Sequence, residues 1–490
     1  MRCLALGLGI ALASAAALAQ PLTPCRLRGM EHEALCGRVS RALDPQRPDG
    51  VRIDVHYAVL PALARNKKLD PVFFFAGGPG QSVIELAGPL SAMLARFGNR
   101  RDIVLIDQRG TGRSAPLLCD ADDPALPLAK QFDTTRRRER LAQCLAKLTA
   151  LPHGDLRFFT TVLAAQDADA VRAALGAERI NLVGASYGTR VALDYQRQFP
   201  ARVRRSVLDG VAPPDMVLPR ASSADNQAAL EAVLAACEQD RRAVIGCALR
   251  YPQLRSEWQA LLAGLPRTVQ IAHPIGGRVE RIVLTRDALL GLVRAPLYSP
   301  ALAAALPQAL DDAARDGRFE PLAALALSLG SRRGVALATG MHFSVVCAED
   351  LPRLDGLGDA PGRDFANSFV EPYREVCATW PRGDVPSAFY SLPRAAAATL
   401  LLSGGADPAT PPRHGARVAM QLGAKARHVV VAQAGHGVMG LPCMRDVIYR
   451  FVDAESDDDA LKVDATCVQA VPRPPAFAPP EASSASGAQR

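Results

Sequence analysis

One serine of this 490-residue chain lies in a sequence setting that suits nucleophilic catalysis. Ser186 is the central residue of the GASYG motif at 184–188, which continues the apolar run NLV and precedes a helical stretch that ends at Pro200. A strand, a sharp turn and a helix are the setting of a nucleophile elbow, where glycines let the backbone turn tightly beneath an exposed hydroxyl. The pattern alone is weak, and a structural strand-to-helix turn is the alternative interpretation.

A serine hydroxyl attacks well only when a base removes its proton, and that base must be oriented by a third group. Asp407 follows the apolar run LLLSGG and His436 follows HVVVAQ, so each residue lies just beyond a predicted strand. This chain order of serine, acid and histidine is the order found in α/β hydrolases. We therefore predict that Ser186, Asp407 and His436 form a catalytic triad.

Other acids and histidines remain as alternatives. Asp209 and Asp215 follow the predicted strand after the nucleophile and could supply the acid from a displaced position. An ordinary loop histidine is the alternative interpretation of His436. Four further histidines fit the base less well, because they begin a strand, lie in a polar turn or fall outside the expected chain order: His428, His414, His153 and His342.

Hydrolysis of an ester or amide passes through an oxyanion, which backbone N–H donors stabilise. We predict that the amide of Tyr187, directly after the nucleophile, supplies one donor. The second donor should come from the loop after PVFFFAGG, where Gly77 and Gly78 allow a close approach and Pro79 stiffens the turn. Within that loop, Gly78 is the predicted donor.

A buried sheet must position these residues. The apolar runs at 71–78, 102–107 and 179–186 are continuous, which is typical of strands buried on both faces of a parallel sheet. The alternating run at 51–59 predicts a half-buried strand, and an Ala-rich helix is predicted at 160–175. Strands that alternate with helices imply a mostly parallel α/β sheet. Further strands are predicted at 204–211, 397–405 and 427–433.

Changes in amino-acid composition along the sequence divide the chain into segments. Long Ala/Leu-rich stretches with few β runs predict a helical insertion, and a Pro-, Ala- and Ser-rich end predicts a disordered tail. The fold class expected is α/β, an α/β-hydrolase fold whose mostly parallel central sheet carries a large helical cap. The expected segments are a signal peptide at 1–19, the first part of the core at 20–214, the cap at 215–393, the second part of the core at 394–470 and the tail at 471–490.

Composition and charge disfavour several classes of protein. Hydrophobic residues make up 49% of the chain and charged residues 22%, which does not suit a collagen, a mostly disordered chain or a multi-span membrane protein. The net charge is +8, but the densest basic run, RRRER at 136–140, lacks interleaved aromatic residues and predicts a solvated helix face rather than nucleic-acid binding. The loop at 109–114 has no lysine before its serine, so it does not match a phosphate-binding loop.

The N-terminus predicts export to the periplasm or the extracellular space. A positive start, a short apolar stretch and small residues before the cut match a secretory signal, and we expect cleavage after Ala19. The stretch is short for a membrane span, so stable membrane insertion is not expected. Lipidation at Cys25 is disfavoured because Pro24 is not the small residue required before the cysteine.

Ten cysteines remain after this cleavage, and an even count in an exported chain favours disulfides. None of them has the CxxC spacing of a zinc ribbon, so no metal site is predicted. We expect pairing between neighbours along the chain, among Cys25, Cys36, Cys119, Cys144, Cys237, Cys247, Cys347, Cys377, Cys443 and Cys467.

Five motifs together resemble the prolyl aminopeptidase and tripeptidyl aminopeptidase branch of the α/β hydrolases: GGPGQS, DQRGTGRS, GASYG, GGADPATP and AGHG. The resemblance spans residues 25–467. It implies serine hydrolysis without a metal or an organic cofactor, a helical cap over the site, and release of residues or short peptides from free N-termini. One departure is Ala76, which stands where prolyl aminopeptidases usually carry a histidine and suits the longer, secreted tripeptidyl type better.

An exopeptidase of this kind must recognise the ammonium group of its substrate, which a partly buried carboxylate does best. Glu349 and Asp350, near the end of the insertion, are the predicted substrate-binding residues. A solvated turn or a helix cap is the alternative interpretation of this acidic pair.

The sequence thus predicts an exported serine hydrolase, an aminopeptidase that acts through an acyl-enzyme on peptides with a free N-terminus. A carboxylesterase or lipase acting on small esters is the alternative, since the same machinery cleaves esters and only the cap discriminates. A non-enzymatic receptor or scaffold is disfavoured, because nucleophile, acid, base and both oxyanion donors occur in the expected order.

Overall fold

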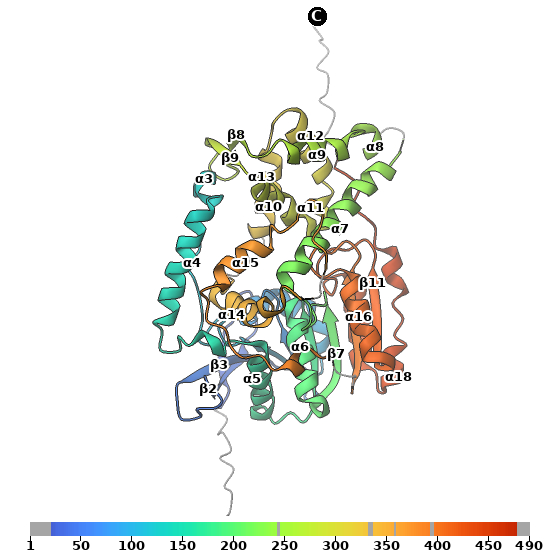
Figure 1. Cartoon of the computed structure of the whole chain (residues 1–490). Helices are drawn as coiled ribbons and strands as arrows, with labels where there is room; N and C mark the ends of the chain where they lie inside the picture. The colour runs from blue at the N-terminus through green and yellow to red at the C-terminus, as the bar shows by residue number, and fades with distance from the viewer. Residues whose placement is uncertain (1–20, 243–245, 332–336, 357–358, 393–395, 478–490) are drawn as a thin grey trace, which may run out of the picture.

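The computed structural model describes residues 21–242, 246–331, 337–356, 359–392 and 396–477, so the predicted signal peptide lies outside the described residues. A nine-stranded sheet forms the centre of the molecule (Figure 1), in the order β1-β2-β3-β5-β4-β6-β7-β10-β11. Neighbours from β5 to β11 pair in parallel, whereas β1, β2, β3 and β5 pair antiparallel. The predicted mostly parallel sheet is confirmed. The strands are β1 (Thr23–Cys25), β2 (Ala34–Ala42), β3 (Arg52–Leu60), β4 (Val72–Phe75), β5 (Ile103–Ile106), β6 (Ile180–Ala185), β7 (Val203–Asp209), β10 (Ala398–Gly404) and β11 (Ala426–Val431).

Helices cover both faces of this sheet, and the two faces have separate apolar cores. On β4, Phe73 and Phe75 pack into one core while Val72 and Phe74 pack into the other, because successive side chains of a strand point to opposite faces. The first core includes residues of α4 (Thr134–Thr149), α5 (Thr161–Ala174), α6 (Tyr187–Gln198) and α16 (Pro412–Leu422). The second includes residues of α1 (Ala87–Met93), α17 (Pro442–Asp453) and α18 (Asp457–Leu461).

The insertion forms a cap with an apolar core of its own around the fully buried Trp258. Figure 1 shows this cap above the sheet, with the antiparallel hairpin of β8 (Arg267–Ala272) and β9 (Val279–Leu284) far from the core. The hairpin was not predicted. None of the helices in the described ranges is long and apolar enough to cross a membrane. The cap helices are α7 (Leu218–Gln239), α8 (Cys247–Arg250), α9 (Leu254–Ala263), α10 (Arg286–Leu297), α11 (Pro300–Ala303), α12 (Leu306–Arg315), α13 (Glu320–Ser331), α14 (Thr339–Glu349) and α15 (Val370–Cys377).

Five disulfides join the ten cysteines, each to its neighbour along the chain, which is the predicted pairing. Two lie within the cap or at its end, two fasten loops of the core, and one links β1 to β2. They are Cys25–Cys36, Cys119–Cys144, Cys237–Cys247, Cys347–Cys377 and Cys443–Cys467.

The first residues of the predicted tail lie against the cap. The guanidinium of Arg473 donates a hydrogen bond to the carbonyl of Ala232 at 3.2 Å, and the amide of Phe477 donates to the carbonyl of Ala304 at 2.8 Å. In the structure, one side-chain and one backbone hydrogen bond thus join residues 473 and 477 of this proline-rich segment to the cap. The rest of the tail lies outside the described residues.

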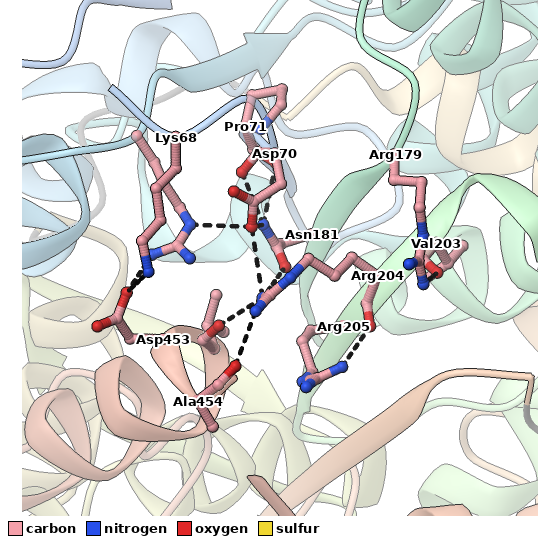
Figure 2. A network of polar contacts seen from close by, with 12 residues as sticks. Lys68, Asp70, Pro71, Arg179, Asn181, Val203, Arg204, Arg205, Asp453 and Ala454 are labelled. Carbon is pink, nitrogen blue, oxygen red and sulfur yellow. Dashed lines mark hydrogen bonds and ion pairs between the residues drawn. The ribbon is translucent and has the colours of Figure 1, made fainter. Parts of the chain in front are cut away.

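A network of ion pairs and hydrogen bonds closes the amino-terminal edge of the sheet (Figure 2). Asp70, just before β4, accepts hydrogen bonds from Arg101 at 3.0 Å and from Asn181 at 2.9 Å. Arg204 on β7 donates to the carbonyls of Val452 and Ala454, at 2.6 and 2.8 Å. The network thus fastens the end of α17 to the starts of three central strands.

Candidate active site

Ser186 lies at a sharp turn between β6 and α6, with a backbone φ of 55°. This conformation is strained for a residue other than glycine and is characteristic of functional turns. The flanking glycines are required by close packing, because a Cβ on Gly184 would lie 2.6 Å from the carbonyl oxygen of Gly188. A Cβ on Gly188 would lie 2.1 Å from the carbonyl oxygen of Phe75. The two glycines therefore let α6 start directly against β6 and β4.

His436 and Asp407 lie beyond the carboxyl ends of β11 and β10, at the same edge of the sheet as Ser186. The Nδ1 of His436 lies 2.8 Å from Oδ2 of Asp407, whose side chain is fully buried. Asp407 also accepts hydrogen bonds from the amides of Ala409 and Thr410, at 2.8 and 3.0 Å, and from the Thr410 hydroxyl at 2.7 Å. Burial acts to raise the pKa of Asp407, but the His436 ring and these donors outweigh it and hold the pKa below its usual value.

The strand β7 brings Ser186 and His436 together. The amide of Ser186 donates to the carbonyl of Asp209 at 2.8 Å. The next residue, Gly210, has a φ of +66°, and a Cβ there would lie 3.4 Å from Cε1 of His436. The backbone at Asp209 and Gly210, at the end of β7, therefore lies between Ser186 and the imidazole of His436.

Asp209, considered above as a displaced acid, has another role in the structure. Its buried carboxylate accepts hydrogen bonds from the amides of Val438, at 3.0 and 2.9 Å, and of Met439 at 2.9 Å. Burial raises the pKa of Asp209 to about 6, although those amides oppose the shift. Asp209 thus holds the loop that follows His436, while Asp407 contacts the imidazole itself. The other displaced acid, Asp215, forms an ion pair with Arg417 on α16.

The predicted oxyanion loop follows β4 and lies against Ser186. A Cβ on Gly77 would lie 2.9 Å from Cβ of Ser186, so a side chain there would collide with the nucleophile. Gly78 is exposed and has a φ of +112°. The start of α14 packs over this loop, since the amide of Ala338 donates to the carbonyl of Gly80 at 2.9 Å. Gly77 of this loop therefore lies against Ser186, with Gly78 next in the chain, and Tyr187 follows the serine as the first residue of α6.

A histidine of the cap also supports this loop. The Nδ1 of His342 lies 3.3 Å from the carbonyl of Pro79, and its Nε2 lies 2.7 Å from the Tyr373 hydroxyl. Burial lowers the pKa of His342 to about 4, and the positive charge of Arg294 adds to this effect. A neutral imidazole accordingly bridges α14, α15 and the oxyanion loop.

Glu349 and Asp350, the predicted substrate-binding pair, are 0% and 1% exposed and form a buried cluster with Arg190. Glu349 accepts hydrogen bonds from the amide and hydroxyl of Thr161, at 2.7 and 2.9 Å. The Thr161 hydroxyl also lies 2.6 Å from that of Tyr187. Burial raises the pKa of Glu349 to about 7, even though Arg190 opposes the shift. Ammonium binding by this pair stays a prediction, since in the structure Arg190 is already the cationic partner of both carboxylates.

Several supporting residues were not identified from the sequence. The DQRGTGRS motif contributes Gln108, which donates to the Tyr187 hydroxyl at 3.0 Å, and Asp107, which accepts from Ser82 of the oxyanion loop at 2.7 Å. A motif shared with a family was the only signal that could have indicated them. Arg190 and Thr161 carried no local signal, because their partners lie far away along the chain.

The comparisons with known proteins agree with this architecture. A family model of the alpha/beta hydrolase fold matches residues 70–252, and a model of TAP-like proteins matches residues 363–467. Serine protease Hip1 of Mycobacterium tuberculosis is 30% identical over 450 residues, which cover 83% of this chain and 83% of that protein. The chain belongs to the α/β-hydrolase superfamily.

Within this superfamily, the chain falls in the branch of the prolyl and tripeptidyl aminopeptidases, and it is a serine hydrolase of the peptidase class. The tripeptidyl aminopeptidase of Streptomyces coelicolor is 29% identical over 483 residues, which cover 90% of this chain and 84% of that protein. Among solved structures, a proline iminopeptidase from Mycobacterium smegmatis aligns with 16% identity and a TM-score of 0.39, over 87% of this chain and 100% of that one. The two family models and the two curated relatives confirm the resemblance inferred from the five motifs.

Proposed function

We propose that Ser186, His436 and Asp407 are the catalytic triad of an aminopeptidase. The observation that carries this proposal is the Asp407–His436 hydrogen bond at 2.8 Å, one backbone turn from a serine on a strained elbow. In this mechanism, Nε2 of His436 takes the proton of Ser186 while the serine attacks the scissile carbonyl. Asp407 accepts the Nδ1 proton and so fixes the tautomer of the ring. His436 then protonates the leaving amine, and water hydrolyses the acyl-enzyme.

The amides of Gly78 and Tyr187 are the proposed oxyanion donors. Gly78 comes from the loop after β4 and Tyr187 from the first turn of α6, so they approach the serine from separate elements. Tyr187 is further held at its hydroxyl, which accepts a hydrogen bond from Gln108 and lies 2.6 Å from the Thr161 hydroxyl. Loss of one oxyanion donor lowers kcat by roughly 100- to 1000-fold in enzymes of this mechanism.

The substrate proposed is a peptide with a free N-terminus, and the proposed location is outside the cytoplasm. Hip1 and the tripeptidyl aminopeptidase, both named as peptidases, cover most of this chain, which supports a peptide substrate. Five disulfides support export, because disulfides persist mainly in oxidising compartments.

Replacing the nucleophile tests the triad. Ser186→Ala should remove nearly all hydrolysis and all labelling by a fluorophosphonate probe, while the circular dichroism spectrum and the melting temperature stay close to those of the parent. Ser256→Ala, at an exposed position on α9, is the matched control and should keep full labelling. Substantial turnover by a folded Ser186→Ala protein would overturn the assignment.

Three substrates test the class of reaction. One chromogenic tripeptide amide is supplied with its N-terminus free or acetylated, beside a short-chain acyl ester. An aminopeptidase should cleave the free-amine peptide and leave the acetylated peptide intact. Cleavage of the ester alone would move the assignment to a carboxylesterase, and equal cleavage of both peptides would replace the exopeptidase by an endopeptidase.

A further inference from the structure

Arg294 on α10 is a cap arginine that lies close to the catalytic residues without a carboxylate partner. Its Nη2 donates to the hydroxyl of Tyr298 at 3.0 Å. Its Cζ lies 4.9 Å from the ring centroid of Phe369 and 5.6 Å from that of Tyr298. The side chain is half-buried, and its Nε is sealed from solvent without an acceptor. Two aromatic rings and one hydroxyl therefore contact this cation directly.

Arg294 differs from the fully buried arginines in lacking a carboxylate partner. Arg101 contacts Asp70, Arg109 contacts Asp167, and Arg190 contacts Glu349 and Asp350. The half-buried Arg267 on β8 shares this feature and also has a sealed Nε, but it stacks on Phe319 within the cap, whereas Arg294 contacts Tyr298 beside His436. Within the described ranges, no carboxylate oxygen lies within 4.0 Å of the Arg294 guanidinium. A guanidinium that is partly removed from water without an anion is costly, and it favours a site where an anion can arrive from outside the chain.

Contacts on two sides place Arg294 beside the reacting groups. The Tyr298 ring meets the His436 ring edge-on, with centroids 5.3 Å apart, and the amide of His436 donates to the Tyr298 carbonyl at 3.2 Å. On the other side, Arg294 stacks on Phe369, the residue that precedes α15, and α15 carries Tyr373, whose hydroxyl contacts His342 beside the oxyanion loop. Arg294 is accordingly connected through Tyr298 to the proposed base and through α15 to the support of the proposed oxyanion loop.

We propose that Arg294, oriented by Tyr298, binds a carboxylate of the peptide substrate. This inference rests on the proposed function and names a feature of its substrate. The planar guanidinium can donate two parallel hydrogen bonds to a carboxylate, and such charge-assisted pairs are strong and geometrically selective. The carboxylate has two possible sources, an acidic side chain in the released segment or the C-terminal carboxylate of a short peptide. The second source fits because Tyr298 packs on His436, which protonates the leaving amine.

Two matched pairs of substrates separate these sources. The first pair is a tripeptide nitroanilide with Glu or Gln at one position, tested at each position in turn. The second pair is tetra-alanine with its C-terminus free or amidated. In the parent protein, kcat/KM for the anionic member of one pair should exceed that of the neutral member by about tenfold or more. Equal rates within both pairs would overturn the proposal.

Variants then assign the preference to Arg294. Arg294→Gln should abolish the preference mainly through KM, and Arg294→Lys should restore part of it, since an ammonium keeps the charge without the planar fork. Arg281→Gln removes an exposed positive charge from β9 and should leave the preference unchanged. An unchanged preference in Arg294→Gln would overturn the proposal. Should that variant fail to fold, Tyr298→Phe supplies the second test, since loss of the orienting hydroxyl should reduce the preference.

The neutral substrates keep the two proposals distinguishable. Cleavage of the neutral free-amine peptides, without any preference for a carboxylate, would leave the aminopeptidase in place and reject only the role of Arg294. No cleavage of any member by a protein that labels with the fluorophosphonate probe would reject the aminopeptidase itself, and the carboxylate site with it.

Discussion

At the scale of single residues, the charge of Asp407 depends on a few short hydrogen bonds. The Thr410 hydroxyl donates to Oδ2, the same oxygen that faces His436 Nδ1. Thr410→Val removes this donor, so the pKa of Asp407 should rise and the carboxylate should orient and stabilise His436 less well. We expect kcat to fall by about tenfold, as for loss of one hydrogen bond to a charged group. Steady-state kinetics on the free-amine peptide measure the effect.

The conservative exchange provides the control for this prediction. Thr410→Ser keeps the hydroxyl and should retain most of kcat. A drop of the same size in both variants would attribute the effect to the packing of the loop, because only the valine variant lacks the donor.

The sequence could identify those site residues that stand in a recognisable motif or directly after a recognisable strand. Ser186 stands in a turn motif, and Asp407 and His436 follow recognisable strands, so their types and order were enough to predict them. Arg190 could not be predicted, since Glu349 and Asp350 lie 159 and 160 residues further along the chain. The sequence indicated the acidic pair as a possible ammonium site, and this stays a prediction; only the fold shows that Arg190 is the partner of both acids.

At the scale of elements, the elbow depends on how closely α6 approaches β4. Gly188→Ala would place a Cβ 2.1 Å from the Phe75 carbonyl oxygen, so the helix must move and displace the serine. We expect a loss of several kcal/mol in the free energy of unfolding, in the range of about 2 to 4, together with loss of activity. Thermal unfolding and probe labelling measure the two effects.

Gly291 is the matched control for that substitution. It lies on the exposed side of α10, where an added Cβ meets nothing within 4 Å. Gly291→Ala should raise the free energy of unfolding by about 0.5 to 1 kcal/mol, because alanine is the better helix former. A stable, active Gly188→Ala protein would contradict the steric account of the elbow.

A strand could be predicted from the sequence where its burial on both faces produced a continuous run of apolar residues. Strands β4, β5, β6, β7 and β10 are buried along their whole length or nearly so, and their continuous apolar runs revealed them. Strand β2 was missed because Arg38, Ser40 and Arg41 interrupt its apolar residues, and most of its positions are only half-buried. The hairpin of β8 and β9 was missed because several of its side chains are exposed and its apolar positions serve the core of the cap.

At the scale of the whole molecule, the two edges of the sheet have different tasks. The carboxyl edge carries the proposed triad, and the amino edge carries the network of Figure 2. Asp70→Asn leaves the fully buried Arg101 with Asp453 as its remaining carboxylate. We expect the free energy of unfolding to fall by about 2 kcal/mol, with kcat/KM unchanged at temperatures where the protein stays folded. Chemical denaturation and peptide kinetics measure the two quantities, and a matching loss of kcat/KM would contradict the separation of tasks.

Arg190, Glu349 and Asp350 join the cap to the core, because Arg190 lies on α6 while both acids lie at the end of α14. Burial raises the pKa of Glu349 from 4.5 to about 7, so the folded state binds a proton that the unfolded chain has lost between these values. The stability from this proton is complete below pH 4.5 and is lost as the pH rises through 7. Glu349→Gln resembles the protonated form and removes this dependence.

The free energy of unfolding of the parent, relative to Glu349→Gln, should therefore fall as the pH rises from 4.5 through 7, by on the order of 3 kcal/mol. Urea unfolding at a series of pH values measures the difference, and Glu371→Gln, an exposed change on α15, should follow the parent. If Glu349 also binds the substrate ammonium, the variant should in addition raise KM for free-amine peptides. The pH slope of stability therefore tests the buried charge of Glu349 in the free protein, and KM tests separately whether this carboxylate recognises the N-terminus of the substrate.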